Sequence, residues 1–194
     1  MKSICVYCGS SPGAKPVYAQ AARAFGQALV REGCSLVYGG GRVGLMGIIA
    51  DAVLEAGGQA IGVIPKLLVD REIGHPGLTE LHVVPDMHER KKKMADLADA
   101  FVALPGGAGT LEELFEVYTW SHLGYHNKPI GLYDVEGYYR PLVAMLEHTV
   151  REGFLRQNYV DALQVDAHAP GLIDKLRRYR PPGSDKWALE RDAV

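Results

Sequence analysis

The residues best suited to chemistry lie where a glycine-rich turn meets a helical pattern. Residues 101–104 are apolar, as in a buried strand, and are followed by Pro105, Gly106, Gly107, Ala108, Gly109, Thr110, Leu111, Glu112 and Glu113. Glycines let backbone N–H groups approach a ligand closely, and a helix points the positive end of its dipole at its first turn. The stretch therefore predicts an anion site, most often for phosphate, with a hydroxyl donor and carboxylates close by.

A structural alternative explains part of this stretch. A tight strand-to-helix turn also uses glycine, and an acidic first turn is favoured by the helix dipole. Three glycines together with a threonine and glutamates exceed what a turn requires. We therefore favour a site that works on a phosphorylated molecule.

A second polar cluster follows the apolar segment 81–84. Met87, His88 and Glu89 precede four consecutive basic residues, 90–93, early in a predicted helix. Cations are disfavoured there by the helix dipole, so a negative group is expected to compensate, and a substrate phosphate is one candidate. A solvated basic face is the alternative. Arg90 and Lys91 lie nearest the end of the strand and are the predicted ligand contacts.

Two other turns carry glycine at strand ends. Gly9, Ser10 and Ser11 follow the first strand, where hydroxyls suit a phosphate or a base edge but equally suit a simple turn. Residues 39–44 match GxGxxG, which raises the possibility of a dinucleotide site. However, this match follows the second strand, and residues 57–69 contain no Asp or Glu to bind a ribose. We therefore interpret residues 39–44 as another wall of the same crevice.

The three cysteines argue against a disulfide framework. Cys5 and Cys8 have CxxC spacing, but no second CxxC or nearby histidine completes a zinc or redox site. We therefore expect a core residue and a turn residue. No bound metal and no cofactor are predicted.

Composition limits the classes of protein to which the chain can belong. The chain has 194 residues, 47% hydrophobic and 23% charged, with a net charge of −2. These values favour one globular domain and give no general reason to expect nucleic-acid or membrane binding. The first residues lack a signal-peptide layout and no apolar run approaches a membrane span, so we expect a cytoplasmic protein.

Strand and helix patterns alternate along the chain. Strands are predicted at 4–7, 35–38, 60–64, 81–84, 101–104, 130–133 and 162–165, separated by helices such as 16–32, 138–152 and 170–179. This alternation predicts an α/β fold, a doubly wound, Rossmann-like parallel sheet with helices on both faces. Residues 1–180 are expected to form one nucleotide-binding catalytic domain, and 181–194 a flexible tail.

Taken together, the motifs resemble the Lonely Guy family of cytokinin-activating nucleoside 5′-monophosphate phosphoribohydrolases. PGGxGTxxE is matched from Pro105 to Glu113, MHxRK from Met87 to Lys91, and GGGxxGLMG from Gly39 to Gly47. The similarity spans about residues 3–155 and is specific as a set.

The resemblance implies hydrolysis of the N-glycosidic bond of adenosine 5′-monophosphate or an N6-modified form, releasing the base and ribose 5-phosphate. It implies that Arg90 and Glu113 are catalytic. The substrate contacts it implies are Glu72, Arg90, Lys91, Gly106, Gly107, Ala108, Gly109, Thr110, Leu111, Glu112, Glu113 and Thr119. Ala108 stands where many relatives carry an aromatic residue. A homodimer is also implied, for which helix 111–123 is the candidate contact.

Three other functions are weighed against this one. Molybdenum-cofactor carrier proteins resemble the PGGxGT motif, but a carrier has no need to retain both Arg90 and Glu113. A pyridoxal-phosphate decarboxylase requires a Schiff-base lysine and a large fold, neither of which is evident in 194 residues. An NAD-dependent enzyme is weakened by the missing acidic residue.

Overall fold

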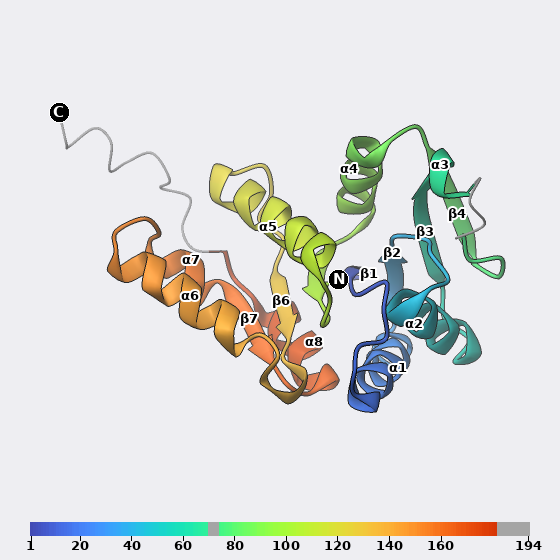
Figure 1. Ribbon diagram of the computed structural model, residues 1–194, viewed down its shortest axis with the longest axis horizontal. Helices are drawn as coiled ribbons and strands as arrows, with labels where there is room; N and C mark the ends of the chain where they lie inside the picture. Colours follow the sequence, from blue (N-terminus) through green and yellow to red (C-terminus); the bar gives the residue numbers. More distant parts are fainter. Residues whose placement is uncertain (70–73, 182–194) are drawn as a thin grey trace.

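The fold is built on one seven-stranded parallel sheet. The computed structural model describes residues 1–69 and 74–181, and the sheet runs in the order β4-β3-β2-β1-β5-β6-β7 (Figure 1). All six strand pairs are parallel. The strands are β1 (Ser3–Tyr7), β2 (Ser35–Tyr38), β3 (Ala60–Pro65), β4 (Glu80–Val84), β5 (Ala100–Ala103), β6 (Ile130–Tyr133) and β7 (Leu163–Asp166).

Helices connect the strands. Pro16 occupies the first turn of α1, where its fixed φ suits a helix and no intrahelical N–H bond is lost. Gly33, with a φ of 66°, ends the same segment. The helices are α1 (Pro16–Arg31), α2 (Gly44–Glu55), α3 (Lys66–Val69), α4 (Met87–Leu97), α5 (Ala108–Leu123), α6 (Arg140–Arg151), α7 (Gln157–Asp161) and α8 (Ala169–Arg178), with a 3-10 turn η1 (Val135–Gly137).

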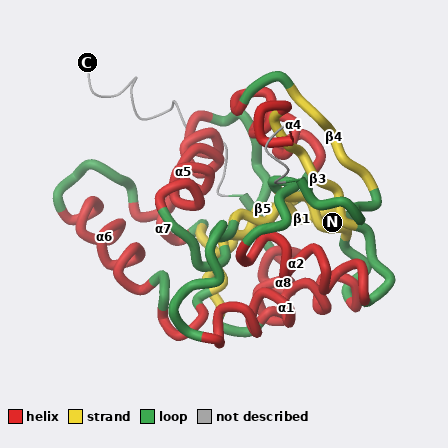
Figure 2. Tube along the Cα trace, turned by 45° about the vertical axis from the view of Figure 1, so that its right-hand side comes forward, coloured by secondary structure: helices red, strands yellow, loops and turns green. Residues whose placement is uncertain are grey.

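The sheet separates two hydrophobic cores. Alternate residues of a strand face opposite sides, so Ile4 and Val6 pack with α1, α2 and α8, whereas Cys5 and Tyr7 pack with α4, α5 and α6. Figure 2 shows α1, α2 and α8 together on one side of the strands and α4 and α5 on the other. The predicted doubly wound fold is confirmed.

The strand order reverses beside β1. The chain passes from β1 outward to β4 and then returns to place β5 against the other side of β1. In open α/β sheets this switch point leaves a crevice at the carboxyl ends of the strands. The glycine-rich turns after β1, β2 and β5 all lie at this end of the sheet.

Differences from the predicted elements are small. Two short helices, α3 and α7, were not predicted, and strand β5 begins and ends one residue earlier than the 101–104 pattern indicated. Leu104 is nevertheless fully buried, which explains why the pattern included it. Residues 182–194 of the predicted tail lie outside the described residues. Among the described helices, none is both long and apolar enough to cross a bilayer.

Tyr139 connects the β6–α6 region to the end of β5. Its buried hydroxyl donates a hydrogen bond to the carbonyl oxygen of Leu104 at 2.6 Å. We predict that Tyr139→Phe lowers the free energy of unfolding by about 1–3 kcal/mol, because a buried carbonyl loses its donor.

Chemical denaturation measures this loss, with Tyr125→Phe as the matched control because Tyr125 is 78% exposed. The control should change stability by less than about 0.5 kcal/mol. Equal effects of the two substitutions would contradict the assigned role of the hydroxyl.

Candidate active site

The structure brings Arg90 of α4 and Glu113 of α5 together. Arg90 Nη1 lies 3.4 Å from Glu113 Oε1, and their side chains are 10% and 12% exposed. The two residues are 23 positions apart in the sequence, on helices that follow β4 and β5 on the same face of the sheet. The predicted catalytic residues therefore form one nearly buried ion pair.

The sheet holds the arginine in place. Arg90 Nε donates to the carbonyl oxygen of Val63 on β3 at 3.2 Å. A charged hydrogen bond to a backbone carbonyl fixes the guanidinium plane more firmly than an ion pair alone. This contact leaves the terminal nitrogens for the carboxylate and for a ligand.

Glu113 has an unusual electrostatic environment. Burial raises the pKa of its carboxyl group above the ordinary value, while the positive charge of Arg90 acts in the opposite direction. A carboxylate that is desolvated and held beside one cation is a common feature of catalytic sites.

Lys91 compensates the charge of the neighbouring carboxylates. Its Nζ lies 2.6 Å from Glu112 Oε1 and 3.0 Å from Glu116 Oε1. Partial burial lowers the pKa of Lys91, but hydrogen bonds to both glutamates raise it overall above the ordinary value. For Lys91, a substrate phosphate is therefore not needed to compensate the charge, because two glutamates of α5 already do so.

The N-termini of α4 and α5 differ. Asp86 caps α4 by accepting hydrogen bonds from the N–H groups of His88 and Glu89 at 2.9 and 3.0 Å. In α5 the N-cap is Gly107, which has no side chain to cap the helix, and the first turn has no acidic residue. The alternative that an acidic first turn explains the motif is therefore wrong, because α5 begins at Ala108 and Glu112 lies beyond its first turn.

The start of α5 is open to ligands. Gly107, Ala108 and Gly109 are exposed, and no atom lies within 4 Å of the position of a Cβ at either glycine. The first N–H groups of a helix have no intrahelical partner, so these amides are free of the helix's own hydrogen bonds and are suited to an anion. Thr110 is 4% exposed and its hydroxyl packs against Gly106, so the structure turns this group inward.

Hydrogen bonds join the three glycine-rich turns. Gly9 donates its N–H to the carbonyl of Pro105 at 3.1 Å, and Leu45 donates to the carbonyl of Gly9 at 3.0 Å. Gly44 has a φ of 59° and lies directly against Ser10, where a side chain does not fit. The turn at residues 39–44 therefore packs against the turn after β1, and its part as a wall of the same crevice stays an interpretation.

A hollow of about 320 Å³ opens between these turns. Tyr138 closes one side and donates its hydroxyl to the carbonyl of Gly106 at 2.5 Å. Its lining includes Ser10 and Ser11, so both serines stand at the crevice as the sequence suggested, with exposed side chains.

One predicted contact, Thr119, is not brought to the pair. Thr119 is exposed one turn beyond Glu116, in a shallow hollow of about 540 Å³ that also contains Phe115 and Leu123. Glu72 lies outside the described residues. Its described neighbour Gly74 forms an isolated bridge with Gly41 of the second glycine turn.

The structure tests the CxxC pattern, and it also places two histidines with HxxxH spacing that the sequence analysis did not consider. Cys5 and Cys8 are free and buried, and burial raises the pKa of both thiols, which confirms their structural role. His122 and His126 are four residues apart, as in some metal sites, but Gly124 ends α5 between them. His126 bonds to the carbonyl of Val117, and His122 stacks on Tyr159. Within residues 1–69 and 74–181, no three His, Cys, Asp or Glu side chains form a metal cluster.

Sequence reasoning missed three supporting groups. These are the Val63 carbonyl, the hydroxyl of Tyr138 and the capping carboxylate of Asp86. Asp86 followed by Glu89 is a recognisable helix-start pattern and could have been found. The other two contacts depend on tertiary packing and leave no local signal.

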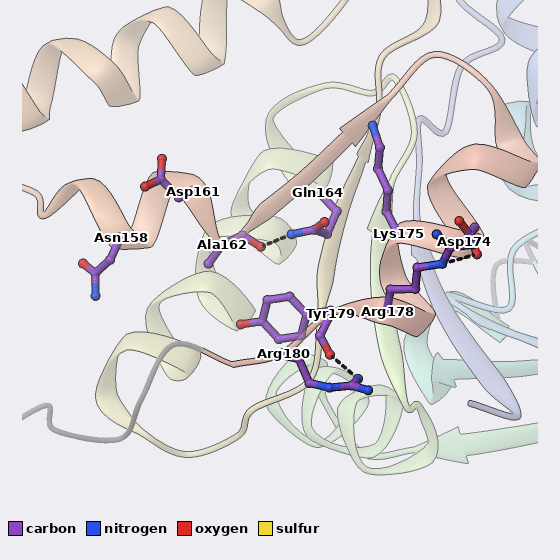
Figure 3. A pocket seen from close by; sticks show the side chains of 9 residues that line it. All are labelled: Asn158, Asp161, Ala162, Gln164, Asp174, Lys175, Arg178, Tyr179 and Arg180. Atoms are coloured by element: carbon purple, nitrogen blue, oxygen red, sulfur yellow. Dashed lines mark hydrogen bonds and ion pairs between the residues drawn. The ribbon is translucent and has the colours of Figure 1, made fainter.

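A separate hollow of about 650 Å³ lies at the β7 edge of the sheet (Figure 3). Its cations are largely neutralised, since Lys175 pairs with Asp166 at 2.9 Å and Arg178 with Asp174 at 3.0 Å. None of the predicted site residues lines it.

Adjacent glycines in the phosphate-type turn offer a matched test. A Cβ on Gly106 would lie 2.1 Å from Thr110 Oγ1 and 2.8 Å from the backbone nitrogen of Gly9, whereas Gly107 has free space. We predict that Gly106→Ala lowers the free energy of unfolding by about 1–3 kcal/mol, because the turn is overpacked. Gly107→Ala should cost clearly less, at most about 1 kcal/mol, because the added carbon meets no atom and alanine is only a poorer N-cap than glycine. Denaturation curves of the two variants check this, and equal stabilities would show that the turns are not packed as described.

Comparisons with known proteins relate this chain to one family. A family profile described as "Possible lysine decarboxylase" matches residues 46–176. A cytokinin riboside 5′-monophosphate phosphoribohydrolase of Rhodococcoides fascians is 56% identical over 177 residues, covering 91% of this chain and 89% of the relative. One from Arabidopsis thaliana is 50% identical over 195 residues, covering 98% and 92%.

A solved protein structure is similar to this chain in its fold. The molybdenum cofactor carrier protein of Chlamydomonas reinhardtii superposes with a TM-score of 0.68 at 20% identity, covering 91% of this chain and 96% of that one. At this identity the likeness shows the fold alone. With the motifs, the paired Arg90 and Glu113 and relatives at 50–56% identity, the chain belongs to the Lonely Guy family of cytokinin riboside 5′-monophosphate phosphoribohydrolases.

Proposed function

We propose that this protein hydrolyses the N-glycosidic bond of adenosine 5′-monophosphate or an N6-modified form, releasing the free base and ribose 5-phosphate. The observation that carries the proposal is the buried Arg90–Glu113 pair beside the uncapped start of α5. The ion pair suits the chemistry at the sugar, and the uncapped start of the helix suits the 5′-phosphate.

The phosphate is bound first in this mechanism. The exposed amides of residues 107–109 and the positive end of α5 hold the 5′-phosphate. Binding energy at the phosphate then positions the ribose over Glu113, one turn farther along the same helix. Since Lys91 is already engaged by Glu112 and Glu116, its part is to keep these carboxylates from repelling the substrate.

Glu113 and Arg90 act at the glycosidic bond. Departure of the base leaves an oxocarbenium-like sugar, which an ionised carboxylate stabilises. Glu113 supplies this charge and orients water toward C1′. Arg90 keeps Glu113 ionised despite its burial and contacts the ribose or phosphate with its remaining N–H donors.

The remaining features of the proposal concern the whole protein. We propose a cytoplasmic homodimer that binds no nucleic acid. Exposed Phe115 (37%) and Leu123 (55%) on α5 support a contact through this helix, whereas Tyr118 is 5% exposed and packs inside the protomer. The net charge of −2 offers no general attraction to nucleic acid.

Substrate cleavage tests the activity directly. Purified protein is incubated separately with AMP and with N6-isopentenyl-AMP, and free base is followed by chromatography. Release of base together with ribose 5-phosphate from either substrate is the expected result. If AMP binds but neither substrate is cleaved, the protein is a carrier that uses the same turn to hold phosphate.

Glu113→Gln separates binding from chemistry. The amide keeps the shape of the side chain but cannot carry the negative charge, so we predict a fall in kcat of at least about 1,000-fold. Binding of AMP, measured by calorimetry, should change by less than about tenfold. Glu147→Gln, on α6 and outside the site, is the control. Turnover that survives in Glu113→Gln would refute the role assigned to the carboxylate.

The titration of Glu113 provides a second test. Its pKa lies above the ordinary value because of burial, so the active ionised form is lost as the pH falls through this raised pKa. Arg90→Ala removes the cation that lowers this pKa, so Glu113 should titrate at still higher pH. NMR of carboxyl-labelled glutamate, with Glu113→Gln for assignment, measures both values. An unchanged pKa in Arg90→Ala would show that the two groups are not coupled.

A further inference from the structure

Gly39 stands at the place where the guanidinium group of Arg90 is held. It follows the last residue of β2 and is buried. A Cβ built on Gly39 would lie 1.9 Å from Arg90 Nη2, 3.0 Å from Cζ and 3.5 Å from Nε. All three of the nearest heavy atoms thus belong to one catalytic side chain, and the Nη2 contact is far inside van der Waals distance.

The backbone of Gly39 does not itself require glycine. Gly40 and Gly44 in the same turn have positive φ values of 72° and 59°, but Gly39 is not among the glycines with positive φ. Alanine at this position therefore avoids the strain of a positive φ. What it cannot do is share the space with the guanidinium group.

The atoms that an added Cβ would contact decide whether a substitution disturbs the fold or only the position of a side chain. At Gly44 a Cβ would meet the backbone of Ser10 at 2.3 Å, which cannot move without displacing a turn. At Gly39 it would meet the far end of a flexible side chain, which can swing aside. Swinging aside breaks the 3.2 Å bond from Arg90 Nε to the Val63 carbonyl and the 3.4 Å pair with Glu113.

We propose that Gly39 is a positioning residue for the proposed reaction, because the absence of its side chain leaves the space in which Arg90 lies against Val63 and Glu113. This assigns a role to the first glycine of the GxGxxG match at residues 39–44. The glycine makes room for a catalytic arginine instead of for a dinucleotide. The inference rests on the proposed function only for the expected loss of kcat. The space that Gly39 leaves for the Arg90 side chain is a property of the fold.

Gly39→Ala is the test, with Gly77→Ala as the matched control. A Cβ on Gly77 would come no closer than 3.5 Å to His75, an ordinary contact. In Gly39→Ala we expect kcat to fall about 100-fold, the loss typical of a catalytic group misplaced by an ångström. The protein should stay folded with a thermal midpoint lowered by about 5–15 °C, because the nearly buried pair with Glu113 is broken. Gly77→Ala should match the natural protein in both measurements.

A spectroscopic signal distinguishes positioning from general damage. Arg90 Nε–H donates to a carbonyl, so its side-chain NMR resonance reports this bond, and Arg90→Ala assigns it. Gly39→Ala should move the resonance or accelerate its exchange with water, and Gly77→Ala should not. Full kcat in Gly39→Ala, or a reduced kcat with an unchanged Nε–H resonance, would overturn the proposal.

A double variant covers the case in which Gly39→Ala does not fold. Because the three nearest heavy atoms to the added carbon all belong to Arg90, truncating that residue should restore the fold in Gly39→Ala with Arg90→Ala. A double variant that remains unfolded would also overturn the proposal. If the natural protein releases no base, the proposed function fails, while the Nε–H resonance still decides whether Gly39 positions Arg90.

Discussion

The arrangement of the crevice depends on one nearly buried ion pair. Taking a carboxylate and a guanidinium group out of water costs several kcal/mol for each, and this cost is offset only if each group finds good partners. Arg90 meets the condition with Glu113 and with the Val63 carbonyl. Breaking either contact leaves a charge without compensation, so α4, α5 and the end of β3 are held in a fixed relation.

The two helices that carry this pair contribute different groups to the crevice. Asp86 occupies the donors at the start of α4, so this helix presents side chains to the crevice. The glycine N-cap of α5 leaves its first amides open, so this helix presents its backbone. The open end of α5 is therefore the end suited to an anion, and in the proposed reaction the groups that act on the sugar come from the next turn of α5 and from α4.

Much of the fold could be predicted from local patterns. The strands β1, β2, β3, β4, β6 and β7 were found within a residue or so because buried parallel strands are short apolar runs bounded by turn residues. Phe101-Val-Ala-Leu104 was displaced by one residue, since Leu104 is as buried as the strand although it lies outside it. The short helices α3 and α7 have too few turns for a periodic pattern to appear.

The sequence by itself determined the doubly wound parallel fold and the family. It also singled out Arg90, Glu113 and the turn before α5 as candidate site residues, because each prediction depends on residues close together in the chain or on a family motif. Only the tertiary structure decided that these two side chains meet, that Lys91 is already paired, and that Thr110 turns inward. It also decided that Gly39 faces the guanidinium group, across 51 positions of sequence. These contacts depend on which surfaces the doubly wound sheet brings together. A contact between elements far apart in the chain leaves no recognisable pattern in the residues around either partner.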